Sequence, residues 1–131
     1  MDRKVQRYRN GELVVVIDCS DVERSARFWS DVLGFTASRA TTGPYRSLVP
    51  ADGDGIEVLL QRVGEEKEQK NRLHLDLRTA DLDAEVDRVL GLGATLVTGA
   101  PIVEDGWRWH ILADPDGNEF CVLQPPDSGG L

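Results

Sequence analysis

His74 and Asp76 are the residues of this 131-residue chain whose types and spacing best suit chemistry. They stand two apart in the segment 73–77 (LHLDL), whose alternating apolar residues predict a strand. Residues two apart on a strand point to the same face, so Leu75 and Leu77 share the other face and belong under a helix. An imidazole beside a carboxylate can move protons or help to hold a metal ion. The face with His74 and Asp76 is therefore a candidate functional surface.

A second candidate surface lies in the stretch 106–111 (GWRWHI). Trp107, Trp109 and Ile111 alternate along a predicted strand and share one face. Two tryptophans near a few polar groups are typical of a site for an apolar or aromatic ligand. The same side chains would equally fill a sheet interior or a dimer interface, and the sequence leaves both interpretations open. His110, on the opposite face, is expected to lie under a helix or at the surface.

The elements that position these residues begin with a strand and a helix. The run 13–19 (LVVVIDC) is apolar and β-branched, which predicts a strand. Ser20 and Glu23 form a capping-box pattern, which predicts the start of a helix. The spacing of apolar residues predicts a helix over 21–33, and Gly34 is placed to end it.

The same pattern returns sixty residues later, where Asp81 repeats Asp21. A second helix is expected over 81–92. Three short strands are expected after each helix: 35–39, 45–49 and 56–62 in the first copy, and 95–98, 107–112 and 119–123 in the second. The sequence DPDG at 114–117 predicts a tight turn before the last strand.

The element order is therefore βαβββ twice, which predicts the α+β class. We expect one domain over 1–131. Its first module spans 12–63, a charged connector without apolar residues spans 64–71, and its second module spans 72–125.

Composition narrows the class of protein. Apolar residues make up 40% of the chain and charged residues 29%, which is typical of a globular protein. The net charge of −8 argues against nucleic acid as a partner, and no apolar run approaches the roughly 20 residues of a membrane span. Cys19 and Cys121 lie in apolar runs, as expected for buried thiols of a cytoplasmic protein. The sequence has no nucleophile elbow, phosphate-binding loop or dinucleotide fingerprint.

Three segments together carry a family resemblance: IDCSDVERSARFWSDVLGF, HLDL and ADPDGNEFCVL. They resemble the glyoxalase/bleomycin-resistance/extradiol-dioxygenase proteins, the vicinal oxygen chelate superfamily, and especially its small glyoxalase-like members. The resemblance covers residues 12–125 and implies a curved, cup-like mixed sheet with helices on its outer face. It also implies a homodimer. These motifs are specific to the fold and not to one reaction.

The resemblance implies a metal centre with one ligand from each of four strands, at Val14, Glu57, His74 and Cys121 of this chain. Val14 cannot ligate a metal, and Cys121 replaces the usual glutamate. A thiolate suits zinc but not hard ions, and a neighbouring carboxylate and an apolar strand both disfavour the thiolate. We therefore expect no cofactor. The alternative is a divalent metal such as zinc, held by Glu57, His74 and Cys121.

The resemblance also implies which residues line the cup. Trp109 and Ile111 take positions that line the apolar part of the substrate pocket. Asp18 replaces the basic residue that binds a glutathione carboxylate in glyoxalase I, so glutathione hemithioacetal is not an expected substrate. The ligand-lining residues are then expected to be Val14, Asp18, Trp107, Trp109, Ile111 and Cys121.

Three functions remain open on this basis. The first is a cytoplasmic homodimer that binds a small, partly apolar organic molecule without a complete metal centre, as bleomycin-resistance proteins do. The second is a metal-dependent lyase, isomerase or dioxygenase that uses Glu57 and His74. The third is a metal-free acid–base enzyme that uses Glu57, His74 and Asp76 as catalytic residues. Metal content distinguishes the second function, and turnover distinguishes the third from the first.

Overall fold

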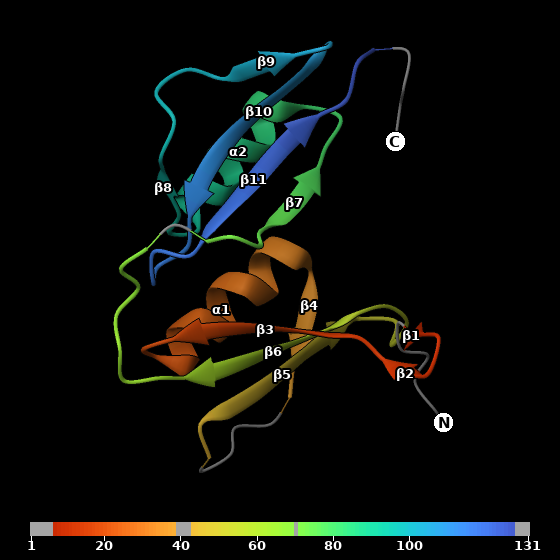
Figure 1. Ribbon diagram of the computed structural model, residues 1–131, viewed down its shortest axis with the longest axis vertical. Helices are drawn as coiled ribbons and strands as arrows, with labels where there is room; N and C mark the ends of the chain where they lie inside the picture. Colours follow the sequence, from red (N-terminus) through yellow and green to blue (C-terminus); the bar gives the residue numbers. More distant parts are fainter. Residues whose placement is uncertain (1–6, 39–42, 70, 128–131) are drawn as a thin grey trace. The chain divides into compact units, whose positions relative to one another are not determined.

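The computed structural model describes residues 7–38, 43–69 and 71–127. The chain divides into two compact units, Met1–Glu66 and Lys67–Leu131, and the division falls inside the expected connector 64–71. Each unit combines one helix with an open mixed sheet, of four strands in the first unit and five in the second (Figure 1). The predicted α+β class and the repeated βαβββ order are thereby confirmed. Neither helix among these residues has the length and apolarity that a membrane crossing requires.

The first unit is built around a four-stranded sheet in the order β3-β6-β5-β4. Its elements are β3 Val14–Cys19, α1 Val22–Leu33, β4 Phe35–Ala37, β5 Tyr45–Pro50 and β6 Glu57–Arg62. Strand β3 runs parallel to β6, and the other pairs are antiparallel. A short hairpin of β1 Arg7–Tyr8 and β2 Gly11–Glu12, which the sequence pattern did not predict, precedes this sheet.

Helix α1 follows the predicted apolar spacing, because Ala26, Trp29 and Val32 are all buried. The helix ends at Gly34, whose φ of 71° is in the left-handed region that glycine adopts without strain. The predicted cap at Ser20 is wrong by one residue. Asp21 caps the helix, and its carboxylate accepts a hydrogen bond from the Arg24 amide at 3.1 Å. Ser20 Oγ instead accepts from the Arg24 guanidinium.

The second unit has its sheet in the order β7-β11-β10-β8, with β9 also paired to β10. Its elements are β7 Leu75–Arg78, α2 Leu82–Gly91, β8 Thr95–Leu96, β9 Ile102–Glu104, β10 Trp107–Ala113 and β11 Glu119–Gln124. Strand β9 was not predicted from the sequence, since its three residues carry little alternation. Strand β7 runs parallel to β11, as β3 does to β6, so the repeat extends to the sheet topology.

One face of the second sheet packs against α2. Asp81 caps this helix as Asp21 caps α1, and Leu82, Val86 and Val89 are its buried residues. Leu112, Phe120 and Val122 are the buried strand residues of this core. His110 lies on the same face of β10 as Leu112 and is also buried, with its Nδ1 2.7 Å from Thr98 Oγ1. The prediction of which side of β10 and β11 faces the helix is confirmed.

The predicted turn at 114–117 joins β10 to β11. The Asp114 carbonyl accepts from the Gly117 amide at 2.9 Å, and the left-handed φ of 86° at Gly117 explains why glycine stands there. The Asp114 carboxylate is buried and accepts from the amides of Asp116 and Asn118 and from the Asn118 side chain. The turn thus sets the register between the two strands that carry most of the candidate site.

Candidate functional site

The side chains on the sheet face away from α2, here called the open face, form two rows across three strands. Residues that pair across neighbouring strands share a face, so the register defines these rows. Asp76, Cys121 and Ile111 form one row, and Arg78, Leu123 and Trp109 form the next. The charged members, Asp76 and Arg78, come from the edge strand β7, Cys121 and Leu123 from β11, and Ile111 and Trp109 from β10.

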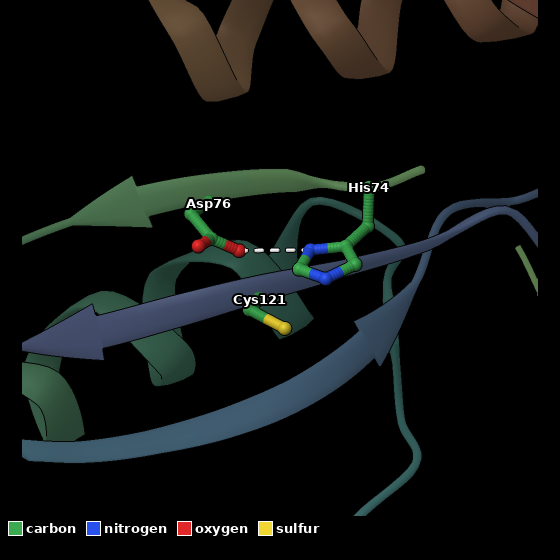
Figure 2. Close-up of side chains that lie close together, drawn as sticks. All are labelled: His74, Asp76 and Cys121. Atoms are coloured by element: carbon green, nitrogen blue, oxygen red, sulfur yellow. Dashed lines mark hydrogen bonds and ion pairs between the residues drawn. The ribbon is translucent and has the colours of Figure 1, made fainter. Parts of the chain in front are cut away.

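His74, Asp76 and Cys121 make a close polar cluster at one end of this face (Figure 2). His74 Nδ1 lies 2.9 Å from Asp76 Oδ1. The side chains of His74 and Asp76 are 48% and 42% exposed, whereas Cys121 is 8% exposed. One nitrogen, one oxygen and one sulfur donor from these residues lie within 4.8 Å of one another. The cluster therefore offers an oriented imidazole beside a thiol, open to a ligand on one side.

The register explains why Asp76 joins this cluster. In the first unit Val14 pairs with Glu57 across β3 and β6. In the second unit Cys121 pairs with Asp76, and His74, the repeat counterpart of Val14, stands two residues before that pair. His74 immediately precedes β7, and a step of two residues along an extended chain returns to the same face, so His74 and Asp76 both lie close to Cys121.

A cavity of about 260 Å³ opens on this face of the second unit. Its wall combines apolar and polar residues: Trp109, Ile111, Phe120 and Leu123 with Asn71, His74, Asp76, Glu119 and Cys121. Asn71 is held in place because its side-chain amide donates to the Glu119 carbonyl at 3.1 Å. A largely apolar wall with a few convergent polar groups is typical of a small-molecule site.

Of the residues predicted to act in the site, the cavity brings together His74, Asp76, Trp109, Ile111 and Cys121. Trp107 shares their face but lies beyond the cavity wall, with its ring 5.0 Å from the Arg78 guanidinium carbon. Val14, Asp18 and Glu57 belong to the first unit, where Glu57 Oε2 accepts from Ser47 Oγ at 2.6 Å. Their part in a shared site with His74 stays a prediction.

Four residues that line the cavity were not among the predicted site residues: Asn71, Glu119, Phe120 and Leu123. Phe120 was predicted, and is found, on the helix side of β11. Strand alternation places Glu119 and Leu123 on the face of Cys121, so the pattern contained a signal for both. Asn71 lies in the connector, where no periodic pattern applies. Only the fold brings it to the first residue of β11.

The donor atoms of the cluster decide which metal this site suits. A histidine nitrogen, a carboxylate oxygen and a cysteine sulfur form a mixed donor set that zinc accepts. Hard ions such as Mg²⁺ and Mn²⁺ prefer oxygen ligands, and a thiol in the set counts against them. The residues therefore fit zinc with three protein ligands and an open position, the pattern of a catalytic rather than a structural site.

The fold and this site together define a class of protein: a βαβββ repeat whose sheet carries a cavity lined in part by a polar cluster. A family model described as a glyoxalase-like domain matches residues 14–123. The chain therefore belongs to the glyoxalase-like family, within the vicinal oxygen chelate superfamily, as its motifs indicated. A search of curated proteins found no match.

Several solved structures share the fold. A glyoxalase/bleomycin resistance protein/dioxygenase family enzyme from Burkholderia phytofirmans PsJN is 20% identical, with a TM-score of 0.68 over 85% of this chain and 95% of that chain. The fosfomycin resistance protein FosX from Mesorhizobium loti is 20% identical, with a TM-score of 0.67 over 92% of this chain and 97% of that one.

A variant of FosX from Listeria monocytogenes is also similar, and its structure contains Mn(II) and 1S,2S-dihydroxypropylphosphonic acid. It is 14% identical, with a TM-score of 0.70 over 88% of this chain and 90% of that one. At these identities the likeness concerns the fold alone.

Proposed function

We propose that this protein binds a small, partly apolar organic molecule in the cavity on the open face of its second unit. The observation that carries this proposal is the composition of the cavity wall. Trp109, Ile111 and Leu123 offer apolar area to the body of a ligand, and His74 and Asp76 offer hydrogen-bonding groups to its polar atoms. A volume of about 260 Å³ suits a molecule of one ring with a short side chain.

The three tryptophans provide the test of this proposal. Trp109 lines the cavity, Trp107 lies beside it, and Trp29 is buried in the core of the first unit. In a protein labelled with ¹⁵N, small aryl and branched aliphatic fragments at millimolar concentration should shift the Trp109 indole resonance and leave that of Trp29 unchanged. Equal shifts at all three indoles, or none at any, would contradict binding in this cavity.

A metal-dependent reaction is the second candidate, and the clustering of His74, Asp76 and Cys121 favours it. In that function, zinc would polarise a ligand oxygen or activate bound water. The His74–Asp76 hydrogen bond equally suits metal-free proton transfer, because the carboxylate fixes one ring nitrogen and leaves the other for a ligand. Glu57 would assist in either reaction only if it reaches the same ligand.

We predict that the purified protein carries well under one equivalent of transition metal. The position at which the family resemblance implies a fourth ligand is Val14, which provides none. The Cys121 thiol is buried and stands opposite the Asp76 carboxylate, and both features disfavour the thiolate that zinc would need. Elemental analysis of the untreated protein is the measurement. A stoichiometric metal that is lost in His74→Ala and kept in His110→Gln would overturn this prediction and favour the metalloenzyme.

We further propose a homodimer in a reducing compartment such as the cytoplasm. Large apolar side chains are exposed on strands near sheet edges, among them Val16 at 50% and Val103 at 65%. Covering such edges is a common use of symmetric association. Light scattering at micromolar concentration should give twice the chain mass of 14.5 kDa. A mass of one chain would reject the dimer.

A further inference from the structure

Arg78 is a charged residue on the open face that neither the cluster nor the cavity wall includes. It is the last residue of β7, it is exposed, and it pairs with Leu123 of the cavity wall across β7 and β11. It is the repeat counterpart of Asp18, sixty residues earlier, so the two modules carry opposite charges at this position. Arg78 therefore places a positive charge beside Leu123, at the edge of a cavity whose wall carries the carboxylates of Asp76 and Glu119.

The guanidinium of Arg78 lies over the ring of Trp107, with 5.0 Å between its carbon and the ring centroid. Stacking fixes the plane of the guanidinium and leaves the N–H groups at its edge available to an acceptor. In residues 7–38, 43–69 and 71–127, no carboxylate forms an ion pair with Arg78. An oriented arginine without a protein anion suits a carboxylate, which it can bind through two parallel hydrogen bonds.

The end of the open face away from Arg78 carries acidic side chains, Asp76 and Glu119. Asp76 already forms a hydrogen bond with His74. It lies two residues from Arg78 on the same strand, about 7 Å along it. The apolar residues Trp109 and Ile111 lie alongside on β10. A bound anion would therefore turn its charge toward Arg78 and its apolar body toward β10.

We propose that the ligand of this cavity is a small organic carboxylate with an aryl or branched apolar body, and that Arg78 selects it. This inference rests on the proposed function, since it names the ligand class of the same cavity. Arg78 acts on the carboxylate head, Trp107 holds the guanidinium in place, and Trp109 contacts the body.

Three probes with one apolar body separate the effect of charge from that of shape: 3-phenylpropanoate, 3-phenylpropanamide and 3-phenylpropylamine. Titrations followed at the Trp109 indole resonance should show the carboxylate binding about fivefold tighter than the amide, as expected for an exposed ion pair. The amine should bind more weakly than both. The advantage of the carboxylate should shrink as salt is added.

Arg78→Gln should make the affinities for the carboxylate and the amide about equal. The affinity for the amide itself should stay unchanged, since only the ion pair is removed. Arg78→Lys should restore part of the carboxylate's advantage, because the charge returns without the planar fork. Arg108→Gln is the matched control. Arg108 lies on the opposite face of β10, so this variant has the same change in net charge and should keep the advantage.

The outcomes distinguish this inference from the proposed function. If amide and carboxylate bind equally well, or the amine binds best, the cavity binds small molecules but Arg78 does not select an anion. The same conclusion follows if Arg108→Gln abolishes the advantage as fully as Arg78→Gln does. If none of the probes shifts Trp109 at millimolar concentration, the proposed function fails and this inference fails with it.

Discussion

Asp114→Ala is expected to destabilise the second unit by about 2–4 kcal/mol, because the buried carboxylate accepts from three donors that the variant leaves unsatisfied. The amides of Asp116 and Asn118 would lose their acceptor, and the 114–117 turn would lose the side-chain hydrogen bonds that stabilise its conformation. Since this turn sets the pairing of Ile111 with Cys121, cavity binding should weaken together with stability. Urea unfolding, combined with hydrogen exchange of the β10 and β11 amides, measures both effects.

Two variants test the origin of this destabilisation. Asp114→Asn keeps an oxygen that accepts from the two amides, but its NH₂ group cannot accept the hydrogen bond from the Asn118 side chain. The loss of stability should therefore be smaller than that of Asp114→Ala. Asp87→Ala removes the same charge from an exposed helix position and should change stability by less than about 0.5 kcal/mol. Equal urea midpoints for Asp114→Ala and Asp87→Ala would show that the carboxylate network contributes little.

Trp109→Ala is expected to weaken binding of 3-phenylpropanamide by about tenfold to thirtyfold, because a half-buried indole supplies much of the apolar contact area of the cavity. The neutral amide is the suitable probe, since its affinity does not depend on Arg78. Titration is followed by calorimetry or by shifts of ligand resonances, because the variant lacks the reporter indole.

Trp107→Ala is the matched control, with the same substitution on the same strand and face. Trp107 lies outside the cavity wall, so amide affinity should change by less than about twofold, while the preference for 3-phenylpropanoate should fall because Arg78 loses its stacking partner. Equal losses of amide affinity in the two variants would mean that the aromatic residues act on the fold rather than on the ligand. Thermal unfolding of both variants separates these effects.

Local patterns were sufficient to predict both helices and most of the strands of this fold. Both helices begin at an aspartate cap and bury most of the residues predicted from helical spacing, and Gly34 ends α1 as expected. The one error at a helix start, Ser20 in place of Asp21, arose because serine and aspartate are both good caps and stand side by side. The repeat favours aspartate as the cap, because Asp81 is equivalent to Asp21, whereas the residue equivalent to Ser20 is Ala80, which cannot cap a helix through its side chain.

The faces of the strands were also predictable, because burial alternates with a period of two. Phe120 and Val122 are buried toward α2, and Trp109 and Ile111 share the opposite face, as the pattern indicated. The unpredicted strands β1, β2 and β9 are two or three residues long, too short for alternation to be recognised.

The sequence by itself thus determined the class of fold, the repeat, and which side of each strand meets a helix. These features depend on neighbours within a few residues, where the geometry of helix and strand dictates the spacing. It also determined that His74 and Asp76 share a face.

Only the tertiary structure decided what those side chains meet. Cys121 lies forty-five residues after Asp76, and its place opposite Asp76 depends on the register of β7 against β11. A register shift of two residues preserves every buried face, so the hydrophobic pattern cannot choose between such registers. For the same reason the contact of Arg78 with Trp107, which points to an anionic ligand, came from the packing of strands and not from the order of residues.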